Sequence, residues 1–546
     1  MGASTNRQMD RLDGITSVDD SARALDDAIW GTNEPKSDLV ARNFMFRYLA
    51  LAVEVVLGVF LLPFNVKHLG TSAYGLLALT ASVTAYFSML DLGYGLAQEK
   101  YAAHYRALKD PHSINSVVST LFFVFTAIGA LTFAITVVIA FNLSHFFNLT
   151  PGQGVEARRV LLVMGAFVAL NFPFSVFGGI VNGFLRNYMN GVVAIVTSVA
   201  AAIVNVLVLW RGLGLLDLVI AVYLVRGLSL WFYRRNAYRV FPALRIRPQY
   251  FQRGRLRTLT SFSIFMLVLD LANKINYSTD AVVIGAFMTA SAVAVWTVGQ
   301  RLIETVQKLT NQLNGSLFPV VVDSATSGRD LRLQRILIQG TRLSLAMVIP
   351  LGVILSVVAK PLVDAWVGPQ FEGSVRVIQI LAVVVIIRVG NATATTLLKG
   401  MERHKLLAAL NTLMSLLNLA LSIALVHKYG LIGVAVGTLI PVGVISIVFL
   451  FPVACKAVGL PIRTVLATGV WPAVWPIALM WAALVITGRF VGDGLILISL
   501  RSGIGLLLYS AAFLCIAIDD VDRRWYLRSA LKLAKRPSWT MTTQPT

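Results

Sequence analysis

The feature that most constrains this chain is the recurrence of apolar runs as long as a bilayer is thick. A helix needs about 20 predominantly apolar residues to cross the hydrocarbon core. Of the 546 residues, 57% are hydrophobic and 13% are charged, which leaves no room for a large soluble catalytic domain. The sequence predicts an all-α integral membrane protein with about fourteen spans, near residues 44–66, 74–97, 114–141, 158–181, 188–210, 213–233, 260–287, 293–321, 337–359, 375–398, 406–426, 430–452, 465–487 and 495–518.

The distribution of Lys and Arg predicts the orientation of these spans. After residue 98, the connections and tail assigned to the cytoplasm hold 26 Lys and Arg residues, against seven on the opposite side. Both termini are therefore expected in the cytoplasm. The net charge of +21 follows this topological pattern, which makes nucleic acid a poor partner. Cys455 and Cys515 offer no metal-ligand spacing, so no metal site is expected.

The chain repeats itself at an offset of about 217 residues. Gly183 matches Gly400 and Arg186 matches Arg403 within two similar helix pairs. Six helices per repeat is an even number, so the two copies enter the membrane in the same sense, and parallel repeats of this kind hold substrate between two halves. The predicted parts are a disordered cytoplasmic tail (1–43), an N-lobe (44–233), a basic cytoplasmic linker (234–257), a C-lobe (258–452), an accessory helix pair (453–518) and a basic cytoplasmic tail (519–546).

Ionisable residues lie inside several predicted spans. Each such group at a helix centre costs about 2.5–3.5 kcal/mol on insertion scales, so it is expected to face a partner or a polar cavity. Positions three and four apart share a helix face, which places the charges of the seventh and eighth spans in stripes. An intrahelical pair between Asp270 and Lys274 is a purely structural alternative for the seventh span.

A shared cavity between the halves, walled by spans 1, 2, 7 and 8, is the economical arrangement. Its bases suit a phosphate or pyrophosphate, which Arg grips through two parallel hydrogen bonds. Its acids are either counter-charges to these bases or sites for a coupled H⁺ or Na⁺, and the sequence leaves both readings open. The candidate substrate-binding residues are Arg47, Lys274, Arg301, Lys308 and Arg388, and the candidate ion-coupling or counter-charge residues are Glu54, Asp91, Asp270, Asp280 and Glu304.

Three segments carry a resemblance to a known family: LLPFNVKHLGTSAYGLLAL, SMLDLGYGLAQEKYAAHY and STDAVVIGAFMTASAVAVWTVGQRL. Over about residues 42–520 the chain resembles polysaccharide transporters of the multidrug/oligosaccharidyl-lipid/polysaccharide exporter superfamily. It departs from them at Trp296, where relatives usually have Tyr.

The resemblance implies a V-shaped, two-lobed bundle in a bacterial inner membrane that works by ion-coupled alternating access. The implied cargo is an undecaprenyl-pyrophosphate-linked repeat unit of O-antigen, capsule or exopolysaccharide. The implied partners are this lipid-linked glycan, membrane lipids and a glycan polymerase machinery, and no cofactor is implied.

Two other functions compete with a flippase. A cation-coupled small-molecule exporter of the same superfamily would have an apolar and acidic pore, which the internal bases argue against. A membrane glycan polymerase or glycosyltransferase would hold its catalytic acids in sizeable external loops, and the external connections here are short. No nucleotide-binding Gly-rich loop with its Lys is present, so neither an enzyme nor an ATP-driven pump is expected.

Overall fold

The computed structural model describes residues 36–254, 256, 279–490, 494–518 and 523. Within these residues every regular element is a helix, which confirms the predicted all-α class. The chain divides into two compact units, Met1–Ala294 and Val295–Thr546, here called unit 1 and unit 2. Most of both predicted tails lies outside the described residues, as do Asp270 and Lys274.

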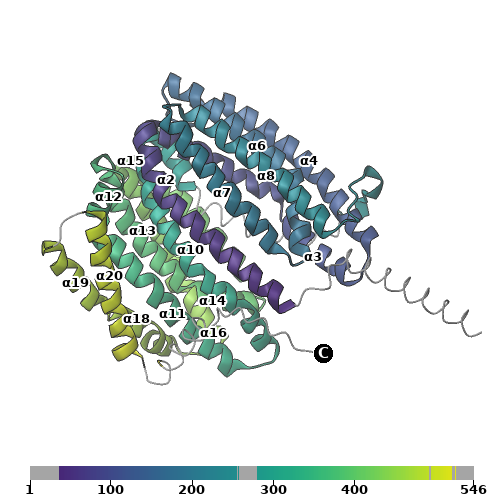
Figure 1. The fold of residues 1–546 in the computed structure, drawn as a ribbon. Coiled ribbons are helices and arrows are strands. Elements are labelled where there is room, and N and C mark those ends of the chain that lie inside the picture. Colours follow the sequence, from purple (N-terminus) through teal and green to yellow (C-terminus); the bar gives the residue numbers. More distant parts are fainter. Residues whose placement is uncertain (1–35, 255, 257–278, 491–493, 519–522, 524–546) are drawn as a thin grey trace, which may run out of the picture. The chain divides into compact units, whose positions relative to one another are not determined.

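Unit 1 is a bundle of long helices. It contains α2 (Lys36–Phe87), η1 (Ser88–Asp91), α3 (Tyr94–Ala107), α4 (Pro111–Phe141), α5 (Leu143–Phe146), α6 (Pro151–Gly183), α7 (Asn187–Trp210), α8 (Leu215–Val240), η2 (Pro248–Tyr250), a helical segment at 279–287 and the first turn of α10 (Ala290–Thr326). Helices α4 and α8 pack against α6, and α2 packs against α6 and α7 (Figure 1). Helix α6 is thus the central helix of the unit.

Capping side chains fix where two of these helices begin. The Asp110 carboxylate accepts a hydrogen bond from the Ser113 amide (3.0 Å), and Pro111 occupies the first turn of α4, where its missing N–H costs nothing. The hydrogen bonds from Ser113 lower the pKa of the Asp110 carboxyl. At the start of α6, the Gln153 side chain accepts from the Thr150 amide (3.0 Å). These caps place the ends of α4 and α6 at fixed points in the chain.

Two backbone breaks divide the first part of the chain, and the one at Gly70 falls between the predicted spans 44–66 and 74–97. Gly70, with φ 79° and ψ 168°, separates α2 into two helices. The predicted span 74–97 is itself interrupted, because α2 ends at Phe87 and α3 starts at Tyr94. Leu92 (φ 53°) and Gly93 (φ 76°) adopt left-handed conformations there, and the chain changes direction. Hydropathy averages over such a turn and therefore does not predict this boundary.

The segment that follows α8 is fastened to α4 by side-chain-to-backbone hydrogen bonds. Asn115 donates to the Ala243 carbonyl (3.0 Å) and accepts from the Arg245 amide (2.8 Å). Ser116 donates to the Tyr250 carbonyl (3.1 Å). The described part of the predicted basic linker is therefore a fixed strap across α4, with its backbone polar groups satisfied.

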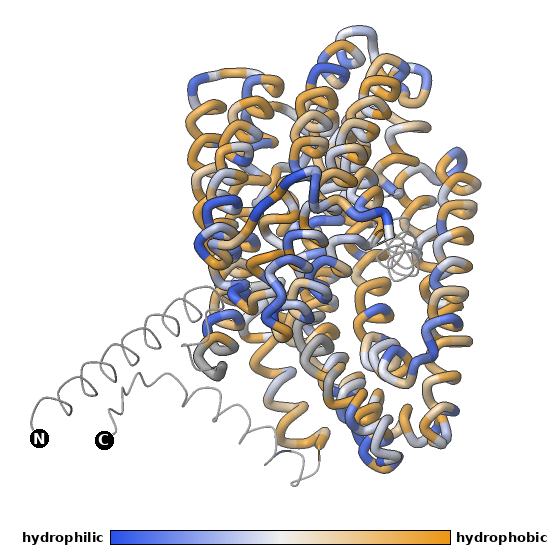
Figure 2. The backbone as a smooth tube through the Cα atoms, turned by 90° about the vertical axis from the view of Figure 1, so that its right-hand side faces the viewer, coloured by the Kyte–Doolittle hydropathy of each residue, from blue (hydrophilic) through white to orange (hydrophobic). Residues whose placement is uncertain are grey.

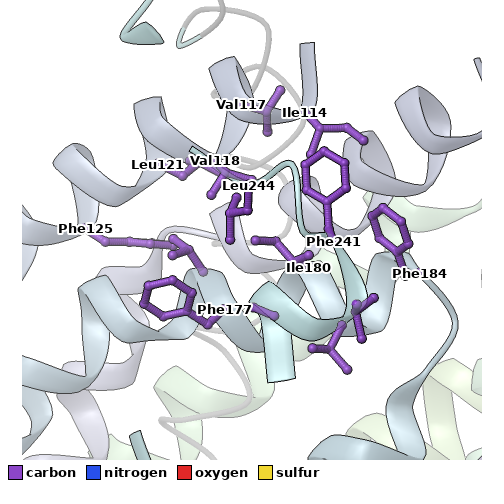
Figure 3. Packing of buried hydrophobic residues seen from close by; sticks show 14 of the residues in the cluster. Ile114, Val117, Val118, Leu121, Phe125, Phe177, Ile180, Phe184, Phe241 and Leu244 are labelled. Carbon is purple, nitrogen blue, oxygen red and sulfur yellow. The ribbon is translucent and has the colours of Figure 1, made fainter. Parts of the chain in front are cut away.

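The main core of unit 1 lies beneath this strap, where α3, α4, α6 and the end of α8 meet (Figure 3). Burial of each large apolar side chain stabilises the fold by about 1.5–3 kcal/mol. The aromatic rings of Phe184 and Phe241 lie 5.5 Å apart within it. Its labelled members are Ile114, Val117, Val118, Leu121, Phe125, Phe177, Ile180, Phe184, Phe241 and Leu244.

Unit 2 is a second helical bundle. It contains the rest of α10, then α11 (Asp330–Val357), α12 (Ala359–Trp366), η3 (Pro369–Phe371), α13 (Gly373–Gly390), α14 (Ala392–Gly400), α15 (His404–Val444), η4 (Ile445–Leu450), α16 (Phe451–Ala457), α17 (Ile462–Val465), η5 (Leu466–Val470), α18 (Trp471–Val474), α19 (Ile477–Phe490), α20 (Leu495–Ala512) and η6 (Phe513–Ala517). Helix α11 packs against α13, α14 and α19, α13 packs against α15, and α19 packs against α20.

The described helices are long and apolar enough to make this a multi-pass membrane protein. Ten helical segments among the described residues have the length and composition to cross a bilayer. Two of them, Arg42–Asp91 (50 residues) and His404–Ala457 (54 residues), are about twice the length that one crossing needs. Each contains a non-helical glycine, Gly70 or Gly430. Figure 2 shows hydrophobic residues along most of the helices, with hydrophilic colour gathered at ends and connections.

Candidate functional site

Two predicted site residues lie on the exposed side of the first half of α2. Arg47 and Glu54 are seven residues apart, so they share one helix face, and both side chains are exposed. The other side of α2 packs against α6 and α7. An arginine and a glutamate are therefore presented outward from residues 44–64 of α2, which are otherwise mostly apolar.

Asp91 and Asp280 lie in more enclosed surroundings in unit 1. The Asp91 carboxylate accepts a hydrogen bond from the Gly95 amide (3.3 Å), so it satisfies an N-terminal amide of α3. Asp280 is 5% exposed. Beside it, the Thr279 hydroxyl lies 2.5 Å from the Tyr86 hydroxyl near the end of α2. Asp280 is thus held where residues 279–287 meet the second half of α2.

The polar stripe predicted on the eighth span is present on α10 as a chain of hydrogen bonds. The Trp296 indole donates to the Gln300 side chain (2.8 Å), and the Gln300 amide donates to the Glu304 carboxylate (2.8 Å). The Arg301 guanidinium contacts the other oxygen of Glu304 at 3.4 Å. Lys308 follows one turn later and is half-buried. Two side chains, Gln300 and Arg301, therefore converge on the carboxylate of Glu304.

This chain of hydrogen bonds includes groups that the sequence-based site did not contain. Gln300 connects an indole to a carboxylate, and its i, i+4 spacing to both Trp296 and Glu304 was legible in the sequence. Trp296, which replaces the usual Tyr of relatives, is fully buried. Its N–H supplies a hydrogen-bonding group of its own at that position.

Arg388 lies near the carboxyl end of α13, and its side chain is half-buried. Helix α13 ends two residues later, and the buried Asn391 marks the break before α14. One face of α13 packs closely against α10, because a Cβ on Gly299 would lie 3.1 Å from the Val377 side chain. Unit 2 therefore carries Arg301, Glu304, Lys308 and Arg388, unit 1 carries Arg47, Glu54, Asp91 and Asp280, and the structure brings Arg301 and Glu304 into contact.

The fold and these charged helix faces define a multi-pass helical membrane protein with ionisable groups inside its apolar segments. A family model described as polysaccharide biosynthesis protein matches residues 68–376, which is more than half of the chain. The chain belongs to this family. The expectation of a polysaccharide transporter of the multidrug/oligosaccharidyl-lipid/polysaccharide exporter superfamily is thereby confirmed.

Individual relatives are distant. The chain is 21% identical over 414 residues to "Probable flippase AglR" of Haloferax volcanii, an alignment that covers 73% of this chain and 80% of that protein. The structure is similar to that of the lipid II flippase MurJ in an inward closed conformation, with TM-score 0.68 and 16% identity over 86% of this chain and 98% of the other. An inward-facing multidrug resistance MATE family transporter matches with TM-score 0.60 and 16% identity over 75% and 94%. The MurJ and MATE structures therefore have the same fold as this chain.

Proposed function

We propose that this protein is a flippase that moves a polyprenyl-pyrophosphate-linked glycan across a cytoplasmic membrane by alternating access. The family match and the relatives named as flippases support transport over catalysis. The finer assignment is an undecaprenyl-linked repeat unit of O-antigen, capsule or exopolysaccharide. It places the protein in a bacterial inner membrane with both termini in the cytoplasm.

The observation that carries the proposal is the exposure of charged side chains on apolar helices. Arg47 and Glu54 are exposed on α2, and the Arg301 side chain is 57% exposed on α10. In contact with lipid each of these groups would oppose membrane insertion by about 2.5–3.5 kcal/mol. A water-filled chamber that receives a charged cargo removes that cost and gives the charges a role.

Backbone breaks at a constant offset support the fourteen-span architecture of two six-helix repeats. Left-handed backbone recurs at Leu185 (φ 61°) and Glu402 (φ 60°), and again at Gly212 (φ 72°) and Gly430 (φ 55°). These pairs are 217 and 218 residues apart. The starts of helices follow the same offset, because α7 starts 217 residues before α15. The kink at Gly70 also lies about as many residues before the point where α10 begins. These matches are between backbone angles and helix limits, whereas the repeat in the sequence is a match between residue types. They are therefore a second line of support for the two repeats.

Close helix contacts repeat in the same way. A Cβ on Gly183 would lie 2.7 Å from the Ala102 Cβ, where α6 meets α3. A Cβ on Gly400 would lie 2.5 Å from a Val321 methyl, where α14 meets α10. Gly183 and Gly400 are 217 residues apart. A glycine is required at both places because a neighbouring helix occupies the space of a side chain.

We propose different roles for the candidate charges, of which Lys274 and Asp270 lie outside the described residues. Arg47, Lys274, Arg301, Lys308 and Arg388 supply the positive charge that a pyrophosphate requires. Glu304, which contacts Arg301 and accepts from Gln300, fits a counter-charge that fixes the arginine. Asp91, which caps α3, fits a structural role. Glu54, Asp270 and Asp280 are then the candidates for a coupled H⁺ or Na⁺.

The test is translocation of a fluorescent undecaprenyl-pyrophosphate sugar in proteoliposomes, followed by quenching of the label that remains outside. We expect Arg301→Glu to abolish translocation. The exchange Arg301→Glu with Glu304→Arg keeps an ion pair on α10 but moves the guanidinium by about one turn of helix. It should therefore not restore transport if the guanidinium holds the cargo. Arg332→Gln, at the surface of unit 2, is the control.

Full transport by the exchanged variant would assign Arg301 a structural ion pair and refute its place in the cargo site. Efflux of small organic cations without glycolipid translocation would instead support an exporter of small molecules. A gradient of H⁺ or Na⁺ that accelerates the wild type, but not Glu54→Gln or Asp280→Asn, would identify the coupled ion and its site.

A further inference from the structure

Two arginines, Arg106 and Arg186, lie beside Phe184 at one end of unit 1. Helix α3 crosses the end of α6 where Gly183 allows Ala102 to approach. Arg106 lies one turn beyond Ala102 on the same face of α3. Its guanidinium carbon lies 5.7 Å from the centre of the Phe184 ring. Arg186 follows two residues after Phe184, in the turn between α6 and α7.

The platform beneath these two arginines is rigid. Phe184 is 4% exposed and packs against Phe241 in the core, as Figure 3 shows. The turn after it is closed by hydrogen bonds from the Leu185 amide to the Asn182 carbonyl (2.8 Å) and from the Arg186 amide to the Val181 carbonyl (3.0 Å). Leu185 adopts a left-handed conformation (φ 61°), which costs energy for a leucine and is held by this turn. The Arg186 backbone and the Phe184 ring beneath Arg106 are therefore held in place.

Among the described residues, the positive charge at this place has no carboxylate partner. The Glu99 carboxylate accepts from the Asn182 amide (2.7 Å), and Asp110 caps α4. Among the described residues neither Arg106 nor Arg186 forms an ion pair with a carboxylate. Both side chains are half-buried. Partial burial, and then the positive charge of Arg186, lower the pKa of Arg106, as expected for two guanidinium groups that lack an anion.

The corresponding end of unit 2 is built differently. The last turn of α10 carries Asp323, which contacts Arg332 at 3.3 Å and Arg329 at 3.6 Å. The arginines after α10 thus have a carboxylate within the protein, whereas Arg106 at the end of α3 has none among the described residues. The two units share positions of left-handed backbone but differ in the charge pairs of their described residues, and an external anion would complete the pair of arginines in unit 1.

We propose that Arg106, set over the Phe184 ring, and Arg186, two residues after Phe184, form a binding site for a phosphate group at the predicted cytoplasmic end of unit 1. Two guanidinium groups hold a phosphate through parallel, charge-assisted hydrogen bonds. The phosphate belongs either to an anionic lipid headgroup or to the pyrophosphate of the lipid-linked cargo before it enters the chamber. The second source rests on the proposed function and the first does not.

The experiment uses the full-length protein in phosphatidylcholine nanodiscs with two probes. Calorimetry measures the affinity for farnesyl pyrophosphate, and native mass spectrometry measures retention of phosphatidylglycerol. The test variant is Arg106→Gln with Arg186→Gln, and the matched control is Arg329→Gln with Arg332→Gln. Each is also made in an Arg301→Gln background, so that binding in the proposed chamber is counted separately. We expect the test variant to lose about tenfold or more in affinity for at least one probe, and the control to lose none.

If the test variant loses only phosphatidylglycerol binding, the site belongs to the membrane lipid. If it loses only farnesyl pyrophosphate binding, the site belongs to the cargo. Wild-type binding of both probes by the test variant, or an equal loss in the control, overturns the proposal. Arg106→Lys with Arg186→Lys keeps the charge but not the paired hydrogen bonds, and it should recover part of the affinity if folding is intact. If Arg301→Gln changes nothing while the test variant still loses binding, the chamber assignment fails and this site stands.

Discussion

The closest backbone approach in unit 1 gives a prediction that depends on geometry alone. Gly75, in the second half of α2, faces the first residue of α10. A Cβ on Gly75 would overlap the Ala290 carbonyl oxygen and lie 2.5 Å from its carbonyl carbon. Both are main-chain atoms, so no side-chain rotation relieves the clash. The substitution Gly75→Ala must move one helix against the other.

The size of the effect follows from that distance. Two carbon atoms pack best at about 3.5–4.0 Å, so the helices must separate by about 1 Å or more. Overpacking of this kind costs about 1–3 kcal/mol. At about 2–4 °C per kcal/mol for a domain of 150–250 residues, Gly75→Ala should lower Tm by about 2–12 °C. Gly58→Ala, in the same helix with nothing within 4 Å of the new Cβ, should instead stabilise the protein by about 0.5–1 kcal/mol.

The chain contains its own reporter for this measurement. Cys455 is buried and Cys515 is exposed, so in a Cys515→Ser background a thiol-reactive dye responds when unit 2 unfolds. Because that reporter lies in unit 2, loss of helical circular dichroism serves as the second probe for unit 1. A Tm for Gly75→Ala equal to or above that of Gly58→Ala, by both probes, would refute the close contact between α2 and α10.

Two further predictions use the same assay. Gly400→Ala should lower Tm because its Cβ would lie 2.5 Å from a Val321 methyl. Adding Val321→Ala should restore part of the lost Tm. If Tm does not recover, this contact is not the cause of the loss. Asp110→Ala should cost about 0.5–2 kcal/mol through the lost cap on Ser113. Because the folded state lowers the pKa of Asp110, this stability is present above the ordinary carboxyl value of about 3.9 and is lost below it. The difference between Asp110→Ala and wild type should therefore shrink on acidification, and a constant difference down to pH 3 would contradict the cap.

The fold was predictable from the sequence wherever long-range averages decide it. The all-helical class and the membrane setting follow from apolar runs of sufficient length. The limits of single helices were less accessible, because they depend on a few backbone angles. The left-handed Leu92 interrupts a span that hydropathy had treated as continuous, and a leucine at that position carries no composition signal. By contrast, Gly70 and Gly430 are glycines at their kinks and were visible as such.

The site was predictable as a set of charges but not as a set of contacts. Helical spacing placed Arg301, Glu304 and Lys308 on one stripe of α10, and the structure has Arg301 against Glu304. The spacing did not distinguish a counter-charge from an ion-coupling acid, because that depends on which neighbours reach each oxygen. Sequence patterns place Arg106 and Arg186 only among the Lys and Arg residues of connections predicted to be cytoplasmic. Their proximity requires α3 to fold back across the end of α6, which no pattern within either helix encodes.

The two proposed repeats combine similar positions of left-handed backbone with different charge pairs among their described residues, and under the proposed function this combination bears on the direction of transport. Left-handed turns at Leu185 and Glu402 give the two units the same connection between spans. If the charges also matched, both units would present the same surface to the cytoplasm, and neither would be distinguished as an entry. Unit 1 instead has paired arginines where unit 2 has Asp323 between its own arginines. The double variant with Asp323→Ala in unit 2 and Arg106→Asp in unit 1 reverses this difference in charge. It should move phosphate binding from unit 1 to unit 2. Binding that stays with unit 1 would show that the difference in charge does not select the entry side.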